Sequence, residues 1–261
     1  MTFGINLKDT VLRAQNISAG YGKKVVVSNA SLNVDSGEIV TLIGPNGSGK
    51  STLLKTLSAQ IPPLEGEIFL LGKNLASLKE KEIAPHISLV MTERIKSGSM
   101  TCREIVATGR YPYTSALGVL SAEDSRKVDG AIKIVNAQEV ADSMFSKISD
   151  GQRQRVMLAR AICQDTEIII LDEPTSFLDL RYKIDLMKII RSLAKEQGKA
   201  VLMSLHELDL AKAVSDKIVC IGGGKIEKAG APDEIFTGNF IQQLFALKDG
   251  EFDPETCRVR I

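Results

Sequence analysis

Residues 44–52 read GPNGSGKST, between the apolar run EIVTLIG at 38–44 and the helical stretch LLKTLSA at 53–59. This matches G-x-x-x-x-G-K-[S/T] after a strand and before a helix, a P-loop whose curled backbone surrounds a phosphate with its amides. Lys50 would neutralise the β- and γ-phosphates, and the Ser51 hydroxyl would bind Mg²⁺. A glycine-rich turn that only enters a helix is the alternative, and it explains neither the Lys-Ser pair nor the preceding strand. The predicted nucleotide-binding residues here are Gly44, Asn46, Gly47, Ser48, Gly49, Lys50, Ser51 and Thr52.

Five short apolar runs predict strands buried on both faces, namely 38–44, 87–91, 167–172, 200–206 and 217–223. Such runs, alternating with helical segments, are typical of a parallel sheet covered on both sides. Residues 181–197 have the apolar spacing of a helix. Residues 11–37, with turns at AGYGKK and DSGE, instead predict an antiparallel β piece. Residues 94–164 contain helix-like segments and no convincing strand, so we expect a helical insertion.

The fold class that follows is α/β, with a P-loop NTPase core around a parallel sheet, an N-terminal antiparallel β subdomain and an inserted helical subdomain. Residues after Gly230 predict two short helices to which the sequence assigns no chemistry. The chain has 261 residues, enough for one large globular domain.

The charge of the chain gives no reason to expect a nucleic-acid or membrane surface, because 33 basic and 32 acidic residues leave a net charge of only +1. Its four cysteines are far apart, which favours reduced, buried thiols over a metal or redox pair. MTFGINLKDTVLR has no signal-peptide pattern, and no apolar run approaches the roughly 18 residues of a membrane helix. We expect a soluble or peripheral protein.

The acidic end of the run IIILDE at 168–173 supplies the partner that a P-loop needs for its metal. Asp172 would contact Mg²⁺ or its water, and Glu173 could polarise the attacking water. An acidic strand end can also be no more than a helix cap. His206 follows another core strand, where it could sense the γ-phosphate, although a lone histidine is usually structural; His86 has no partner in view.

The stretch SKISDGQRQRVMLARA at 146–161 begins an amphipathic helix and allows two interpretations. Ser149 followed by Gln152 fits a capping box, which needs no further function. A helix N-terminus is also an anion site, and Gly151 would let a phosphate approach the backbone. The residues alone leave both open.

Taken in order, GPNGSGKST, ISDGQRQR, IIILDEPTSFLD and SLHELD resemble the ATP-binding subunit of ABC transporters, from Tyr21 to the last strands. The resemblance implies a single nucleotide-binding domain over 1–261, with residues 1–93 and 165–261 as the ATP-binding core with its β subdomain and 94–164 as the helical signature subdomain. It also implies a head-to-tail dimer, in which Ser149, Gly151 and Gln152 serve the ATP held by the P-loop of the partner chain.

The same resemblance assigns further positions. Tyr21 matches the aromatic that stacks on adenine, and Asp179 the loop that crosses the dimer interface. Glu93 stands where the family usually has a glutamine that binds Mg²⁺ and senses the permease, and it adds a negative charge there. Asp150 replaces a common glycine.

We expect both departures to be tolerated, since Mg²⁺ prefers oxygen ligands and Arg153 and Arg155 lie within about a turn of Asp150.

The implied activity is ATP hydrolysis with Lys50, Glu173 and His206 as catalytic residues and Ser51, Asp172 and Glu93 around Mg²⁺. GRYPY at 109–113 and HELDLA at 206–211 look like the importer branch for ferric siderophores, haem and cobalamin, although Arg110, Tyr111 and Tyr113 could equally be an uninformative surface helix end. The implied partners are a second copy, membrane permease subunits and, indirectly, a substrate-binding protein, at the cytoplasmic face of the inner membrane, with no nucleic acid. The alternative is a non-transport ABC ATPase that clamps nucleic acid or ribosomes.

Overall fold

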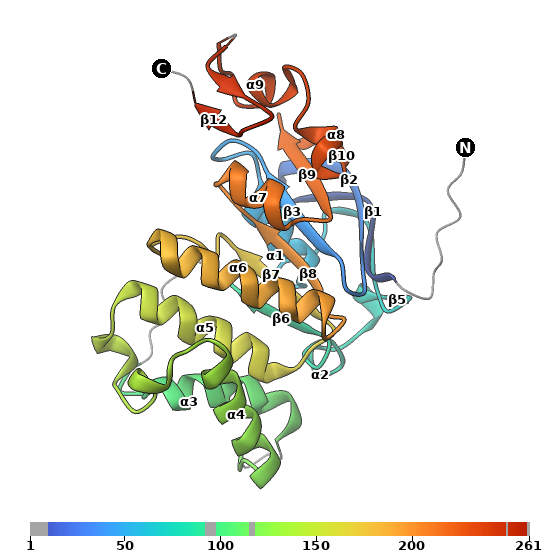
Figure 1. The fold of residues 1–261 in the computed structure, drawn as a ribbon. Helices are drawn as coiled ribbons and strands as arrows, with labels where there is room; N and C mark the ends of the chain where they lie inside the picture. The colour runs from blue at the N-terminus through green and yellow to red at the C-terminus, as the bar shows by residue number, and fades with distance from the viewer. Residues whose placement is uncertain (1–9, 92–97, 115–117, 249, 260–261) are drawn as a thin grey trace.

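A six-stranded sheet runs through the centre of the molecule in the computed structural model, which describes residues 10–91, 98–114, 118–248 and 250–259 (Figure 1). Its strand order is β10-β9-β3-β8-β7-β6. The five parallel strands are β3 (Ile39–Ile43), β6 (Ile87–Val90), β7 (Ile168–Asp172), β8 (Ala200–Ser204) and β9 (Lys217–Gly222), and β10 (Lys225–Gly230) pairs antiparallel to β9. The predicted parallel sheet is confirmed, and it places the ends of β3, β7 and β8 side by side.

An antiparallel sheet of order β2-β1-β4-β5 packs beside this core. β1 (Thr10–Tyr21) and β2 (Lys24–Asp35) confirm the antiparallel piece expected at 11–37, whereas β4 (Glu65–Leu70) and β5 (Lys73–Asn74) were missed by the sequence analysis. Helix α1 (Lys50–Leu57) buries its leucines among residues of both sheets. The apolar face of α1 therefore fixes the P-loop between the two sheets.

A helical part lies between β6 and β7 in the chain, at the bottom of Figure 1. It contains α3 (Cys102–Ala107), η2 (Thr108–Tyr113), α4 (Ala122–Ile134), η3 (Gln138–Val140), η4 (Phe145–Lys147) and α5 (Asp150–Gln164). In the described residues of this region, one isolated bridge between Thr101 and Met144 is the only β pairing. The expected helical insertion is confirmed as part of the fold.

Arg110 is held inside the helical part, with only 5% of its surface exposed. Its Nε donates to Asp124 Oδ1 at 2.8 Å, and its Nη1 donates to the Cys163 carbonyl oxygen at 2.8 Å. Hydrogen bonds from Ser121 and then from Arg110 lower the pKa of Asp124 from 3.8 to about 2. The alternative that Arg110 belongs to a surface helix end is wrong, although it describes the exposed Tyr111 correctly.

The remaining helices are η1 (Leu75–Ser77), which packs beside β4, α2 (Glu80–Ile83), α6 (Leu180–Lys195) and α7 (Leu208–Val214), the last two along the core sheet, and, near the C-terminal end, α8 (Pro232–Ile235) and α9 (Phe240–Leu244). Helices α8 and α9 confirm the two short helices expected after Gly230. They are followed by a small hairpin of β11 (Phe252–Asp253) and β12 (Arg258–Val259). Over the described ranges, no helix has the length and apolar character needed to span a bilayer.

Candidate functional site

The loop between β3 and α1 has a backbone path that only glycine permits at two positions. A Cβ on Gly44 would lie 2.1 Å from the carbonyl oxygen of Ile221. Gly49 has φ +104°, and a Cβ there would lie 2.3 Å from Val27 Cγ2. The loop is consequently pressed against β9 and β2, and its curl is set by close packing as well as by its own sequence.

Lys50 begins α1 and is 95% buried, since only 5% of its surface is exposed. Its Nζ donates to the carbonyl oxygens of Gly44 at 2.7 Å and Pro45 at 3.0 Å, so the ammonium group lies within the loop. Burial lowers the pKa of Lys50, while the nearby carboxylates of Glu173 and Asp172 act in the opposite direction. A cation held in this way suits an anionic ligand in the loop.

Two groups within the loop suit the phosphates of a nucleotide. One is the buried Lys50 ammonium described above. The Ser48 hydroxyl is buried and has no hydrogen-bond partner among the described residues. A phosphate oxygen would satisfy that hydroxyl, because a buried polar group without a partner is costly.

Asp172, at the end of β7, lies next to the P-loop serine. Ser51 Oγ donates to Asp172 Oδ1 at 3.1 Å, and Ser204 Oγ, at the end of β8, donates to the same oxygen at 2.7 Å. The described residues contain no group of three or more His, Cys, Asp and Glu side chains that could hold a metal alone. Mg²⁺ commonly takes one or two protein oxygens together with substrate phosphates, and a hydroxyl beside a carboxylate fits that requirement.

Glu173 and His206 meet at the same edge of the sheet. His206 Nε2 and Glu173 Oε1 are 2.5 Å apart, although the two residues are separated by 33 positions. Glu173 has φ +49°, an uncommon backbone conformation for a residue other than glycine, and its amide donates to Ser204 Oγ at 2.9 Å. The structure therefore brings the two predicted residues together with the P-loop lysine, Ser51 and Asp172.

Ser204 was not among the predicted site residues, yet it bonds both neighbouring acids of the site. It lies at the end of a continuous apolar run and is fully buried. A hydroxyl at the end of such a run is the only signal that the sequence offers, because its partners come from β7.

The predicted capping box at the start of α5 is confirmed. Ser149 Oγ accepts from the Gln152 amide at 3.3 Å, and the Ser149 amide donates to Gln152 Oε1 at 3.0 Å. Arg153 Nη1 donates to Asp150 Oδ1 at 2.7 Å and balances its negative charge, as expected. Arg155 does not, because it donates to the Asn136 carbonyl oxygen and stacks on Tyr182 instead.

The other described positions predicted for the site lie at the start of α6, on β1 and in α5. Asp179 caps α6 by accepting from the Tyr182 amide at 3.0 Å. Tyr21 is half exposed at the end of β1. Gly151 packs toward Leu178, and within the described part of the chain no hydrogen bond joins the α5 cap to the P-loop. Glu93 lies outside the described residues.

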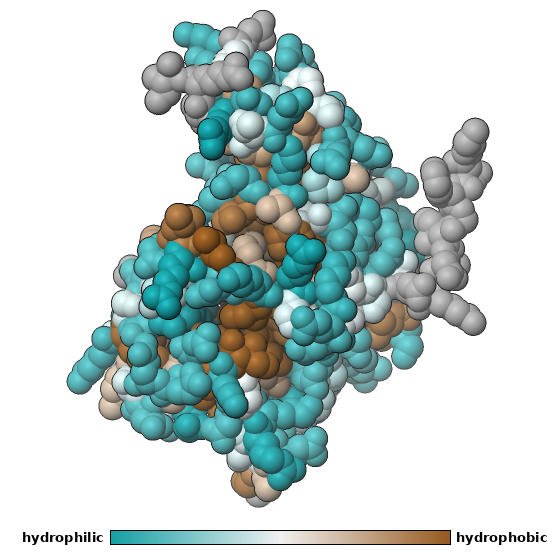
Figure 2. All heavy atoms as spheres, viewed as in Figure 1, coloured by the Kyte–Doolittle hydropathy of each residue, from teal (hydrophilic) through white to brown (hydrophobic). Residues whose placement is uncertain are grey.

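Two large apolar side chains are exposed beside Asp179. Phe177 is 72% and Leu180 is 71% exposed. Phe177 also has φ +65°, which is unusual for a bulky residue. Apolar surface, brown in Figure 2, gathers over the region where α6 begins in Figure 1. Exposed apolar side chains beside a strained loop are typical of a contact surface.

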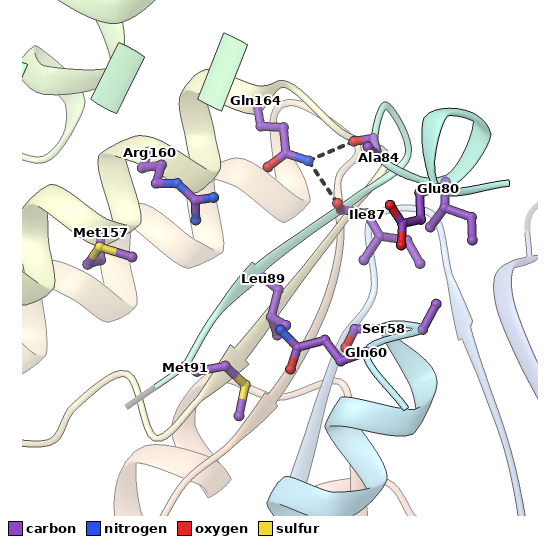
Figure 3. A pocket seen from close by; sticks show the side chains of 12 residues that line it. Ser58, Gln60, Glu80, Ala84, Ile87, Leu89, Met91, Met157, Arg160 and Gln164 are labelled. Atoms are coloured by element: carbon purple, nitrogen blue, oxygen red, sulfur yellow. Dashed lines mark hydrogen bonds between the residues drawn. The ribbon is translucent and has the colours of Figure 1, made fainter. Parts of the chain in front are cut away.

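A groove of about 590 Å³ separates the core sheet from the helical part (Figure 3). Gln60 after α1 and Leu89 on β6 form one wall, and Met157 and Arg160 of α5 form the other. Arg160 points toward the groove in Figure 3, its Nε donates to Thr108 Oγ1 at 2.9 Å, and burial lowers its pKa.

Comparison with known proteins places this site in context. Residues 27–176 match the family model described as ABC transporter. The iron(3+)-hydroxamate import ATP-binding protein FhuC of Bacillus subtilis (strain 168) is 36% identical over 94% of this chain and 91% of its own length. The ferric enterobactin transport ATP-binding protein FepC of Escherichia coli (strain K12) is also 36% identical, over 91% of this chain and 88% of its own.

Among solved structures, the ATP-binding cassette MJ0796, a dimer in a post-hydrolysis state bound to ADP and Pi, superposes with a TM-score of 0.75. It is 25% identical, and the match covers 84% of this chain and 98% of that one.

Proposed function

The chain belongs to the ABC transporter family as one of its ATP-binding, ATP-hydrolysing subunits, and from this premise we propose that it drives the import of an iron siderophore through a membrane permease. The observation that carries the ATP-hydrolysing part of this proposal is the convergence of Lys50, Ser51, Asp172, Glu173 and His206 at one edge of the sheet. These residues come from the ends of β7 and β8 and from the start of α1, so the fold supplies the whole arrangement.

Each residue has a distinct part in the proposed hydrolysis. Lys50 and the loop amides hold the β- and γ-phosphates, with the Ser48 hydroxyl as a further donor. Ser51 and Asp172 would hold Mg²⁺, which neutralises charge on the phosphates; Glu93 is proposed to join them. Glu173 orients the water that attacks the γ-phosphorus, and ADP leaves from the opposite side. His206 holds the Glu173 carboxylate and steadies the reacting phosphate.

We propose that ATP closes a head-to-tail dimer of two copies, with Ser149, Gly151 and Gln152 of one contacting the γ-phosphate bound by the other. The dimeric state of the related cassette MJ0796 supports this, as do the apolar side chains exposed around Asp179. The start of α5 is a helix N-terminus, and such a terminus suits a phosphate. Tyr21, exposed at the end of β1, is proposed to stack on adenine.

The groove in Figure 3 is proposed to receive a cytoplasmic helix of the permease. Its two walls belong to the core and to the helical part, and Glu93 follows β6 in the sequence. A helix bound there would be displaced when one wall rotates against the other as the dimer closes. The subunit would then act as a peripheral protein on the cytoplasmic face of the inner membrane.

The cargo class rests on relatives rather than on the site, because this chain meets ATP and not the chelate. FhuC and FepC are named for the import or transport of two chemically different iron siderophores. A ferric siderophore is therefore the cargo we propose, and haem and cobalamin are the alternatives for the same assay. A substrate-binding protein would deliver the cargo outside.

The deciding experiment measures ATP hydrolysis by this chain with the permease encoded beside it and its binding protein in membranes. Ferric siderophores, haem and cobalamin are added separately. Stimulation by a ferric siderophore alone is expected; stimulation by none, with ATP hydrolysis by the chain intact, would remove the import proposal and leave the ATPase.

A Glu173→Gln variant tests the hydrolytic assignment, since it should bind ATP, lose turnover and run as a stable dimer in size-exclusion chromatography. A variant that stays monomeric with ATP and turns over at the wild-type rate would contradict the mechanism.

A further inference from the structure

Glu207, the residue after His206, connects three elements around the site. Its Oε1 pairs with Lys183 Nζ on α6, and its Oε2 accepts from Thr175 Oγ1 at 2.8 Å. Burial raises the pKa of Glu207, but the hydrogen bonds from Lys183 and Thr175 outweigh it and hold the pKa below its ordinary value. The carboxylate is thus charged and fixed at both oxygens.

Two hydrogen bonds that join the segment after β7 to the segment at the end of β8 flank the pair of Glu173 and His206. On one side, the Glu173 amide donates to Ser204 Oγ at 2.9 Å. On the other side, Thr175 donates to Glu207 at 2.8 Å. The two segments are therefore hydrogen-bonded to each other on both sides of the contact in which His206 Nε2 lies 2.5 Å from Glu173 Oε1.

The short connection from β8 to α7 makes the second tie important for His206. Only residues 205–207 join the strand to the helix. The amide of buried Leu205 donates to the Leu42 carbonyl oxygen at 3.2 Å, which anchors the beginning of the connection. Glu207 anchors its end, and the partly exposed His206 stands between the two anchors.

We propose that Glu207 is a positioning residue for ATP hydrolysis, whose bond to Thr175 holds the His206 segment against the Glu173 segment. The proposal rests on the hydrolytic function assigned above. Lys183 lies one turn into α6, after Asp179, so the same carboxylate links the imidazole to the surface proposed to meet the second copy. The opposing interpretation is that Glu207 only stabilises the fold.

Kinetics of the intact transporter separate these interpretations. Glu207→Ala and Thr175→Val each should lower kcat about ten- to a hundredfold, as expected when reacting groups lose alignment, and leave the KM for ATP unchanged. Thr175→Ser keeps the hydroxyl and should restore kcat. The double variant should lose no more than Glu207→Ala alone, because both changes break the contact between Thr175 and Glu207 and only Glu207→Ala also removes the pair with Lys183.

Asp165→Asn is the matched control, since this carboxylate is held by Lys127 and Lys199 away from the site. Its kcat should equal that of the wild type. Wild-type kcat in Glu207→Ala, or equal losses in Thr175→Val and Thr175→Ser, would overturn the proposal.

A second measurement does not depend on turnover. The chain has two histidines, so a sample labelled with ¹³C-histidine gives one imidazole signal for His206 and one for His86. Thr175→Val should shift or broaden the His206 signal and leave the His86 signal, whose ring is paired with Glu167, unchanged. An unchanged His206 signal refutes the positioning role. A wild-type transporter that never hydrolyses ATP would instead refute the proposed function, and the His206 signal would still decide on Glu207.

Discussion

Replacing Ser204 by alanine should destabilise the protein far more than loss of one serine hydroxyl usually does. Ser204 is fully buried, and its Oγ both donates to Asp172 Oδ1 at 2.7 Å and accepts from the Glu173 amide at 2.9 Å. Alanine is almost the same size, so the change leaves no significant cavity. The effect is therefore that of the lost hydrogen bonds.

The size of the effect follows from the groups that lose Ser204. A buried donor left without its partner costs about 1–3 kcal/mol; the Glu173 amide is part-buried, and the buried Asp172 carboxylate loses one donor as well. We expect the free energy of unfolding to fall by about 2 kcal/mol. For a chain of this length that corresponds to a fall in Tm of about 4–8 °C. Turnover should fall too, because the Glu173 amide is no longer held.

Urea unfolding of the nucleotide-free chain measures this, and Ser88→Ala is the matched control. Ser88 is a buried serine on β6 whose Oγ lies 3.0 Å from Thr166 Oγ1; Thr166 donates its single hydroxyl hydrogen to the Ile168 carbonyl oxygen at 2.8 Å and therefore accepts from Ser88. The control should lose less than about 1 kcal/mol and keep its turnover. Equal losses of stability in the two variants would refute the reasoning.

Three further predictions concern the P-loop, the loss of stability at low pH and the thiols. Gly44→Ala should abolish ATP binding in a fluorescent-nucleotide titration, because its Cβ would lie 2.1 Å from the Ile221 carbonyl oxygen; wild-type affinity would show that the loop can move aside. The pKa of Asp124 falls from 3.8 to about 2 on folding, so its contribution to the free energy of unfolding is present above about pH 4 and is lost as the pH falls toward 2. In unfolding measured between those pH values, Asp124→Asn should lose less stability than the wild type does as the pH falls. An equal loss in the two proteins would contradict the assignment. Burial raises the pKa of Cys220 to about 12, so a thiol reagent at pH 8 should reach the partly exposed Cys257 first and Cys220 only on unfolding; early modification of Cys220, read by peptide mass, would argue against its burial.

Local pattern was enough for the parts of the protein whose signal lies in neighbouring residues. GPNGSGKST between a strand and a helix predicted the P-loop, and the apolar runs predicted the five parallel strands. Ser149 and Gln152 predicted their own capping box, because both partners lie within one helical turn. The β4 and β5 strands were missed, since they are short and largely polar and are stabilised by pairing, β4 with β1 and β5 with β4.

Only the tertiary structure decided which side chains meet. Strand order puts the end of β8 beside that of β7, and this brings Ser204 to Asp172 and His206 to Glu173 across more than 30 positions. Arg155 shows the reverse case, because it lies near Asp150 in sequence but turns toward Asn136. A helix or strand period fixes the face on which a residue lies, whereas the partner on the neighbouring element is fixed by sheet order and packing, and neither is written in a local stretch of sequence.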